Sequence, residues 1–270
     1  MFRLRAVIVV LPLAVLLLSC SFRGPSERVQ PGVPTVAPVP RLPRPQPPRI
    51  YRLGHLDTLV QVPGRVLPIH QASRGVYEKL PQTLKIPLNP TSAEEEEAFD
   101  FAAEERLRLR KAGPLVQRTS RTLWLRPSHT KPVALVSIPA EDERNVAYEY
   151  VADIPAIRQW LVAVRLYEGG YYLLIDKRTG RRTRVWSPPA VAPDGQHFVC
   201  GNSDVLARYE PSGIQLWAVE ENGLRRLWER QTEWGCTQPR WLDSKTILFE
   251  QDFFDNGDVD TRVVRLTVVP

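Results

Sequence analysis

The sequence predicts a mainly β fold with one α-helix, attached to an export segment. From residue 115 onward, short runs alternate apolar and polar residues with period two, which is typical of half-buried strands. Turn residues separate these runs about every 8–12 positions. A helical pattern occurs once, before the runs begin. We therefore expect an antiparallel sheet region in which neighbouring strands follow one another along the chain.

Residues 1–19 are predicted to be a secretory signal. Arg3 and Arg5 precede an apolar run at residues 6–18. A membrane-spanning helix needs roughly 20 apolar residues, so this run is too short to span comfortably. We expect the segment to direct export.

The end of this signal, Leu17-Leu18-Ser19-Cys20, resembles the lipobox of bacterial lipoproteins. The resemblance implies cleavage before Cys20 and acylation of Cys20 as the first residue of the mature protein, anchoring it in a membrane. The alternative is a cysteine that closes an ordinary signal. The residue after Cys20 is Ser21 and not aspartate. By the lipoprotein sorting rule of enteric bacteria, this favours attachment to the outer membrane. The sequence does not indicate whether the protein would face the periplasm or the cell surface. Either orientation makes the protein a component of a bacterial cell envelope.

Residues 20–48 are predicted to form a linker. Nine of the thirty residues 21–50 are proline, without apolar periodicity. Such a segment forms an extended spacer of about 3.1 Å per residue. A proline-motif ligand for a partner is the alternative reading. The net charge of +6 is mild and spread out, so we expect no nucleic-acid partner.

Residues 49–113 are predicted to be irregular chain with one or two short edge strands, followed by a capping helix over about 92–112. Ser92 and Glu95 have capping-box spacing, and Gly113 ends the helix. The face expected to lie on the domain carries Ala98, Phe101, Ala102, Leu109 and Ala112.

The predicted β domain, residues 114–270, contains an internal repeat. Residues 173–186 align with residues 216–229, and each stretch predicts a hairpin that turns at a glycine and ends near a tryptophan. The first turn is basic and the second mixed in charge, so we expect solvated hairpins whose geometry matters more than their charge. The matched pairs are Gly180 with Gly223 and Trp186 with Trp228.

A second pair of stretches, residues 189–200 and 239–249, also aligns. Asp194 meets Asp243, and an alternating strand follows each. A fainter earlier copy places Asp142 in a similar turn. The period is therefore about 42–52 residues with about four strands, which is the spacing of propeller blades.

The Ala-Pro-Asp-Gly turn at residues 192–195 and the hairpin at residues 176–180 resemble PD40 (TolB-like) and WD40-like propeller repeats over about residues 135–265. The resemblance implies four-stranded meanders, of which about three fit here, in a partial propeller capped by the helix. The alternatives are a β-sandwich of stacked sheets and a ring completed by association between chains. The resemblance implies no activity, because such repeats serve binding, scaffolding and enzyme domains alike.

The search for chemistry finds no nucleophile elbow, phosphate loop, dinucleotide motif or metal-ligand spacing of histidines. We therefore expect a binding or scaffolding protein without catalytic activity or cofactor, whose partner is an envelope protein or a glycan. The alternatives are a hydrolase acting on glycan or peptide and a self-associating structural lipoprotein.

Three weaker features remain. Four aspartates around a glycine could hold Ca²⁺, although the Asn256-Gly257 pair more simply predicts a hairpin. These are Asp252, Asp255, Asp258 and Asp260. Cys200 and Cys236 could form a disulfide or remain buried free thiols. Trp186 and Trp228 are expected in the core, whereas Trp234 is predicted to be exposed in a loop as a ligand contact.

Overall fold

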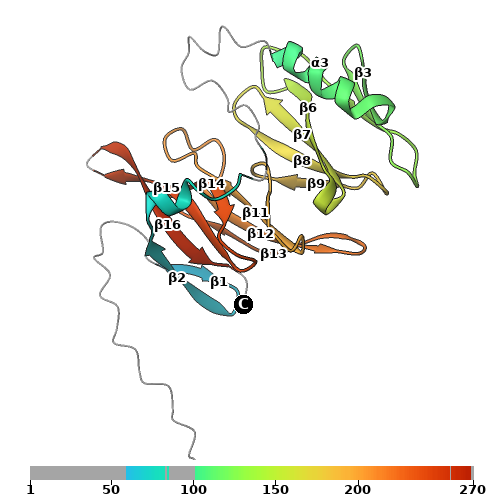
Figure 1. Ribbon diagram of the computed structural model, residues 1–270. Helices are drawn as coiled ribbons and strands as arrows, with labels where there is room; N and C mark the ends of the chain where they lie inside the picture. The colour runs from blue at the N-terminus through green and yellow to red at the C-terminus, as the bar shows by residue number, and fades with distance from the viewer. Residues whose placement is uncertain (1–58, 83, 85–100, 256, 269–270) are drawn as a thin grey trace, which may run out of the picture. The chain divides into compact units, whose positions relative to one another are not determined.

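The computed structural model describes residues 59–82, 84, 101–255 and 257–268 (Figure 1). All of them belong to one compact unit. Strands dominate this unit, so the predicted mainly β class is confirmed. The predicted signal, Cys20 and the proline-rich linker lie outside the described residues. No helix among the described residues is both long and apolar enough to cross a membrane.

The strands form four antiparallel sheets, and the first three sheets are meanders in which each strand pairs with the next along the chain. The first sheet contains β3 (Val116–Thr119), β4 (Thr122–Leu125) and β5 (Val133–Val136). The second contains β6 (Val146–Ile154), β7 (Gln159–Leu166), β8 (Gly170–Asp176) and β9 (Arg182–Val185). The third contains β10 (Ala190–Val191), β11 (His197–Asn202), β12 (Gly213–Glu220) and β13 (Gly223–Gln231).

The last sheet joins distant parts of the chain. Its C-terminal strands are β14 (Gly235–Trp241), β15 (Thr246–Asp255) and β16 (Asp258–Thr267), and its N-terminal strands are β1 (Leu59–Val62) and β2 (Arg65–Gln71). Leu266 of β16 pairs with Ile69 of β2. One or two short edge strands were expected before the helix; β1 is an edge strand of this sheet, whereas β2 lies between β1 and β16. The repeat predicted about three units, whereas the structure has four sheets.

The aspartates of the repeat have one structural role. Asp194 accepts a hydrogen bond from the Gln196 N–H (2.9 Å), and Asp243 accepts one from the Lys245 N–H (2.7 Å). The Asp194 turn joins β10 to β11, and the Asp243 turn joins β14 to β15. The turn at Asp142 has the same hydrogen bond, from the Arg144 N–H (2.9 Å), and it lies between Ile138 and Val146, which form an isolated antiparallel bridge at the start of β6. In the second sheet the first two strands are joined by η2 (Pro155–Ile157), after which Arg158 adopts a left-handed φ of 57°.

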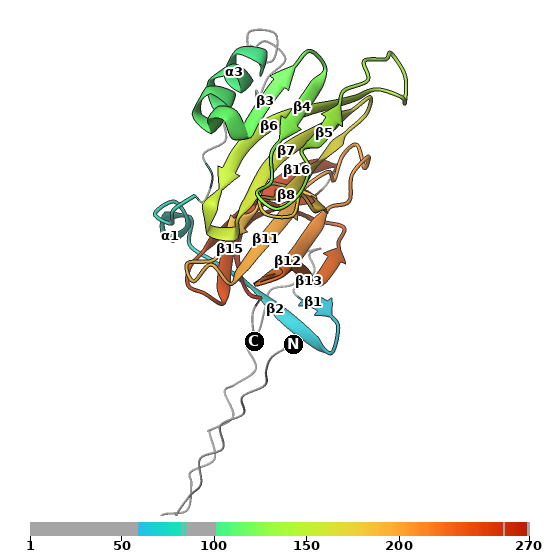
Figure 2. The same cartoon turned by 90° about the vertical axis from the view of Figure 1, so that its right-hand side faces the viewer.

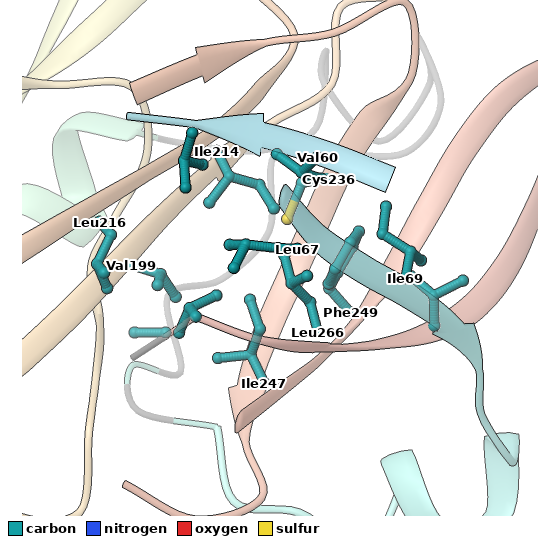
Figure 3. Packing of buried hydrophobic residues seen from close by; sticks show 14 of the residues in the cluster. Val60, Leu67, Ile69, Val199, Ile214, Leu216, Cys236, Ile247, Phe249 and Leu266 are labelled. Carbon is teal, nitrogen blue, oxygen red and sulfur yellow. The ribbon is translucent and has the colours of Figure 1, made fainter. Parts of the chain in front are cut away.

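Consecutive sheets share apolar cores. One buried cluster joins β3–β5 to β6–β8, a second joins β6–β9 to β10–β13, and a third joins β10–β13 to the last sheet. In this third cluster, Val60 and Leu67 of the N-terminal hairpin lie beside Phe249 and Leu266 (Figure 3). The short helix α1 (Arg74–Tyr77) packs against Leu248 and Val263 of the last sheet. Trp186 and Trp228 are both buried, as predicted.

The described part of the predicted helix is α3 (Phe101–Ala112), which lies beside β3 and β6 (Figure 2). It is followed by a single turn of 3-10 helix, η1 (Gly113–Leu115). Leu109 and Ala112 pack against the first core, as expected, but Ala102 is exposed. Instead, the carboxylate of Glu105 is buried on this face. Charge as well as apolar contact therefore attaches the helix to the sheets.

The basic hairpin tip between β8 and β9 is not simply solvated. Arg178 donates from Nη2 to the carbonyl of Glu221 (3.2 Å), and Arg158 donates to the carbonyl of Glu220 (3.1 Å). Arg178 of this tip and Arg158, which follows η2, thus both bind the hairpin between β12 and β13. The two hairpin tips are therefore neighbours, and the arginines satisfy backbone carbonyls there. That the geometry of this turn matters more than its charge stays a prediction.

Candidate functional site

The two described cysteines are free thiols, both buried. Cys200 belongs to the core between the second and third sheets, whereas Cys236 belongs to the core between the third and last sheets. The disulfide is therefore not formed, and the alternative of buried thiols describes the structure. Burial raises the pKa of each thiol above its ordinary value. Both thiols are thus poor nucleophiles at neutral pH.

The four aspartates near the C-terminus lie on the hairpin of β15 and β16, with Asp255 opposite Asp258 at its turn. Asp252 accepts a hydrogen bond from the Thr261 hydroxyl (2.7 Å), and Asp260 accepts one from the Thr261 N–H (2.7 Å). The predicted hairpin is confirmed. Among the described residues, no three His, Cys, Asp or Glu side chains gather so that they could hold a metal ion. The structure therefore offers no support for the Ca²⁺ reading.

The prediction that Trp234 is an exposed contact is wrong. Only 2% of this residue is exposed, and its ring stacks on that of Phe249 with 5.8 Å between the ring centroids. It precedes β14 directly and fills the core between the last two sheets. Its neighbours in sequence suggest a loop, but a large indole gains more by burial in this core.

No sequence pattern predicts a functional role for the connection between β11 and β12. This segment, residues 203–212, is held by its own polar groups. The Asp204 N–H donates to the Ser212 hydroxyl (2.8 Å), and the Glu210 N–H donates to the Asp204 carboxylate (2.8 Å). The Asn202 amide donates to the Pro211 carbonyl (2.9 Å). These hydrogen bonds join the beginning of the loop to its end, and we call it the braced loop.

This braced loop exposes large apolar side chains. Leu206 is 70% exposed and Tyr209 is 60% exposed. Tyr167, which is 57% exposed, lies in the adjoining turn between β7 and β8. The two segments touch, since a Cβ atom on Gly169 would lie 3.5 Å from the Tyr209 Cβ. We call Tyr167, Leu206, Arg208 and Tyr209 the loop patch.

Charged groups surround the loop patch. Arg208 has a left-handed φ of 58° and lies 4.0 Å from Glu233, while Arg184 lies 3.5 Å from Glu210. A hollow of about 470 Å³ adjoins Tyr209 and is lined mostly by polar residues. The carboxylates of Asp204 and Glu210 in this hollow already bind the loop itself and Arg184. The arrangement therefore suits contact with a partner surface better than acid–base chemistry.

One signal in the sequence could have revealed the loop patch. Ten residues separate β11 from β12, which is longer than a two-residue hairpin needs, and they include Leu206 and Tyr209 among polar and turn residues. Alternation alone gives no reason to look there, because the segment has no strand or helix period.

Comparison with known proteins gives no relative from which a role could be transferred. No family model matches the chain, and no curated protein or solved structure matches it significantly. The geometry of the described residues and the sequence of the exported segment are therefore the basis for a functional proposal.

Proposed function

We propose that this chain is a lipid-anchored protein of a bacterial cell envelope that binds another envelope protein through the loop patch. The lipobox-like ending at Cys20 supports an outer-membrane anchor, and the proline-rich stretch after it supports a tether. The series of antiparallel meanders is compatible with the propeller-like scaffold that the repeat suggests. In this proposal the β-rich unit presents a binding surface and carries out no catalysis.

The observation that carries the proposal is the exposure of Tyr167, Arg208 and Tyr209 on a braced loop. Tyrosine and arginine are enriched among the residues that dominate protein–protein binding energy. Because hydrogen bonds already fix the loop, binding loses less conformational entropy there. Leu206 adds apolar area without a hydrogen-bonding group, which favours a protein partner over a glycan.

Photo-crosslinking in living cells tests this proposal. A photoreactive phenylalanine analogue at Leu206 should crosslink to one discrete protein, while the same analogue at Leu242, which is 41% exposed, should not. Tyr209→Ala should lower the yield from position 206 about tenfold, as expected for a binding hot spot. Identical products from both positions would contradict the proposal. A crosslink to a second copy of this chain would favour self-association instead, and a crosslink to glycan would favour a sugar-binding role.

Replacement of Cys20 tests the anchor. Cys20→Ala should move the protein from the membrane fraction to the soluble fraction and abolish incorporation of labelled palmitate, because no thiol remains to accept the lipid. Ser21→Ala is the matched control and should leave both unchanged. If the Cys20→Ala protein still sediments with membranes, the lipoprotein assignment fails.

A further inference from the structure

A cavity of about 680 Å³ lies between α3 and β6. Its volume is within the range of about 300–1,000 Å³ typical of small-ligand sites. Most of its lining is apolar, and we call it the helix cavity. The apolar residues of its lining are Leu84, Leu107, Ala112, Leu115, Tyr150, Val151, Ala152 and Trp160.

One wall of the helix cavity is β6, whose register against β7 shifts between Tyr150 and Ala152. Such a bulge changes the direction of side chains and is common beside functional sites. It places consecutive residues, Tyr150 to Asp153, in the lining. The other wall is α3, which is attached to β6 by Glu105 and by Arg108. Two walls of the cavity are therefore linked by hydrogen bonds, and Leu115 of η1 and Trp160 of β7 also contribute to the lining.

The charged residues of the lining are not equivalent. Glu104, which also lines the cavity, lies 3.9 Å from Arg108. Arg108 donates to Glu149 (2.8 Å), and Asp153 accepts from Lys177 (2.7 Å). Lys111 also lines the cavity and is exposed, and it forms no ion pair with any described residue. The cavity thus combines apolar walls with one uncommitted cation.

We propose that the helix cavity binds an amphiphile with an apolar chain and one anionic headgroup. The chain occupies the apolar lining, and the headgroup lies beside Lys111, where it gains a cationic partner. A free fatty acid and an anionic phospholipid share this chemistry. The inference is independent of the loop patch and of the anchor at Cys20, so it stands or falls separately from the proposed function.

Calorimetric titration with dodecanoate tests the inference. The chain from residue 21 onward is suitable, because the anchor is then absent and the compact unit retains its own cores. We expect saturable one-to-one binding. Dodecyltrimethylammonium, which has the same chain and a cationic head, should bind about tenfold more weakly, since attraction to Lys111 becomes repulsion. Equal binding of the two amphiphiles would overturn the inference, as would failure of dodecanoate to saturate.

Variants locate the site. Lys111→Glu should weaken dodecanoate binding about tenfold for the same electrostatic reason. Lys131→Glu, at an exposed position outside the cavity, should bind as the unaltered chain does. Leu107→Gln should also weaken binding, and because Leu107 is 46% exposed the fold should survive, which circular dichroism verifies. Equal losses in Lys111→Glu and Lys131→Glu would overturn the inference.

Vesicles distinguish the two sources of the ligand. Sedimentation with phosphatidylglycerol vesicles that is lost in Lys111→Glu and competed by dodecanoate would assign a membrane lipid. Saturable binding of dodecanoate without sedimentation would assign a free fatty acid. Sedimentation that is unaffected by Lys111→Glu, together with unaltered dodecanoate binding in that variant, would contradict the site.

Discussion

Replacing Glu105 with glutamine should lower the free energy of unfolding by about 3 kcal/mol, the lower end for breaking a buried ion pair. Glu105 is 8% exposed, and its carboxylate accepts hydrogen bonds from Arg118 Nε (2.7 Å), Arg118 Nη2 (2.6 Å) and the Tyr150 N–H (2.7 Å). Glutamine keeps the shape but removes the charge that neutralises Arg118. Urea unfolding followed by tryptophan fluorescence measures the loss.

Glu104→Gln is the matched control for this variant. Glu104 precedes Glu105 on α3, but its side chain is 35% exposed and its carboxylate lies 3.9 Å from Arg108. We expect a change below about 0.5 kcal/mol, as for other exposed pairs. Equal effects of the two substitutions would show that the Glu105 network does not hold the helix. Combining Glu105→Gln with Arg118→Met should recover part of the loss, because the unpaired cation is then removed.

Local chemistry explains what the sequence could predict of the fold. Short apolar, β-branched and aromatic runs between turn residues identified the strands of the second and third sheets, of which β7 and β12 are buried on both faces. The hairpins were identifiable because Gly180 and Gly195 adopt left-handed φ values of 70° and 69°, which glycine adopts without strain. The aspartate turns follow the same logic, since short polar side chains bind the backbone nearby.

Long-range pairing explains what could not be predicted. No local pattern indicates that β2 pairs with β16, because register between distant strands depends on packing in three dimensions. The strands of the first sheet that were missed as a unit, β3 to β5, have four residues each. The turn after η2 was missed because an arginine, Arg158, occupies the left-handed position where glycine is the usual signal.

The candidate site shows the same limit. Leu206 is exposed although it is apolar, and Trp234 is buried although its neighbours in sequence suggest a loop. Trp234 packs on Phe249, while Leu206 lies in a loop whose polar groups bind one another. Glu105 was missed for a related reason. Its partner Arg118 lies 13 positions away, beyond the three- or four-residue spacing that helix patterns reveal.

Replacing Gly201 with alanine should lower the free energy of unfolding by about 3 kcal/mol, because the added methyl group overpacks a closed core. A Cβ atom at Gly201 would lie 2.5 Å from both the carbonyl oxygen and the Sγ of Cys236. The carbonyl belongs to the backbone of β14, so rotation of a side chain cannot relieve the contact. The third and last sheets would have to separate. Thermal and urea unfolding both measure the loss.

Gly75→Ala provides the control, since the same substitution on α1 meets only the Ser73 hydroxyl, at 3.8 Å. It should raise stability by about 0.5 kcal/mol through the lower entropy of the unfolded chain. Cys236→Ala removes the sulfur but leaves the carbonyl. In the Gly201→Ala background it should therefore relieve only part of the clash, which a double-mutant cycle resolves. If Gly201→Ala changed the free energy of unfolding as little as Gly75→Ala does, β11 and β14 would not approach closely at this point. The packing described for the core between their sheets would then be wrong.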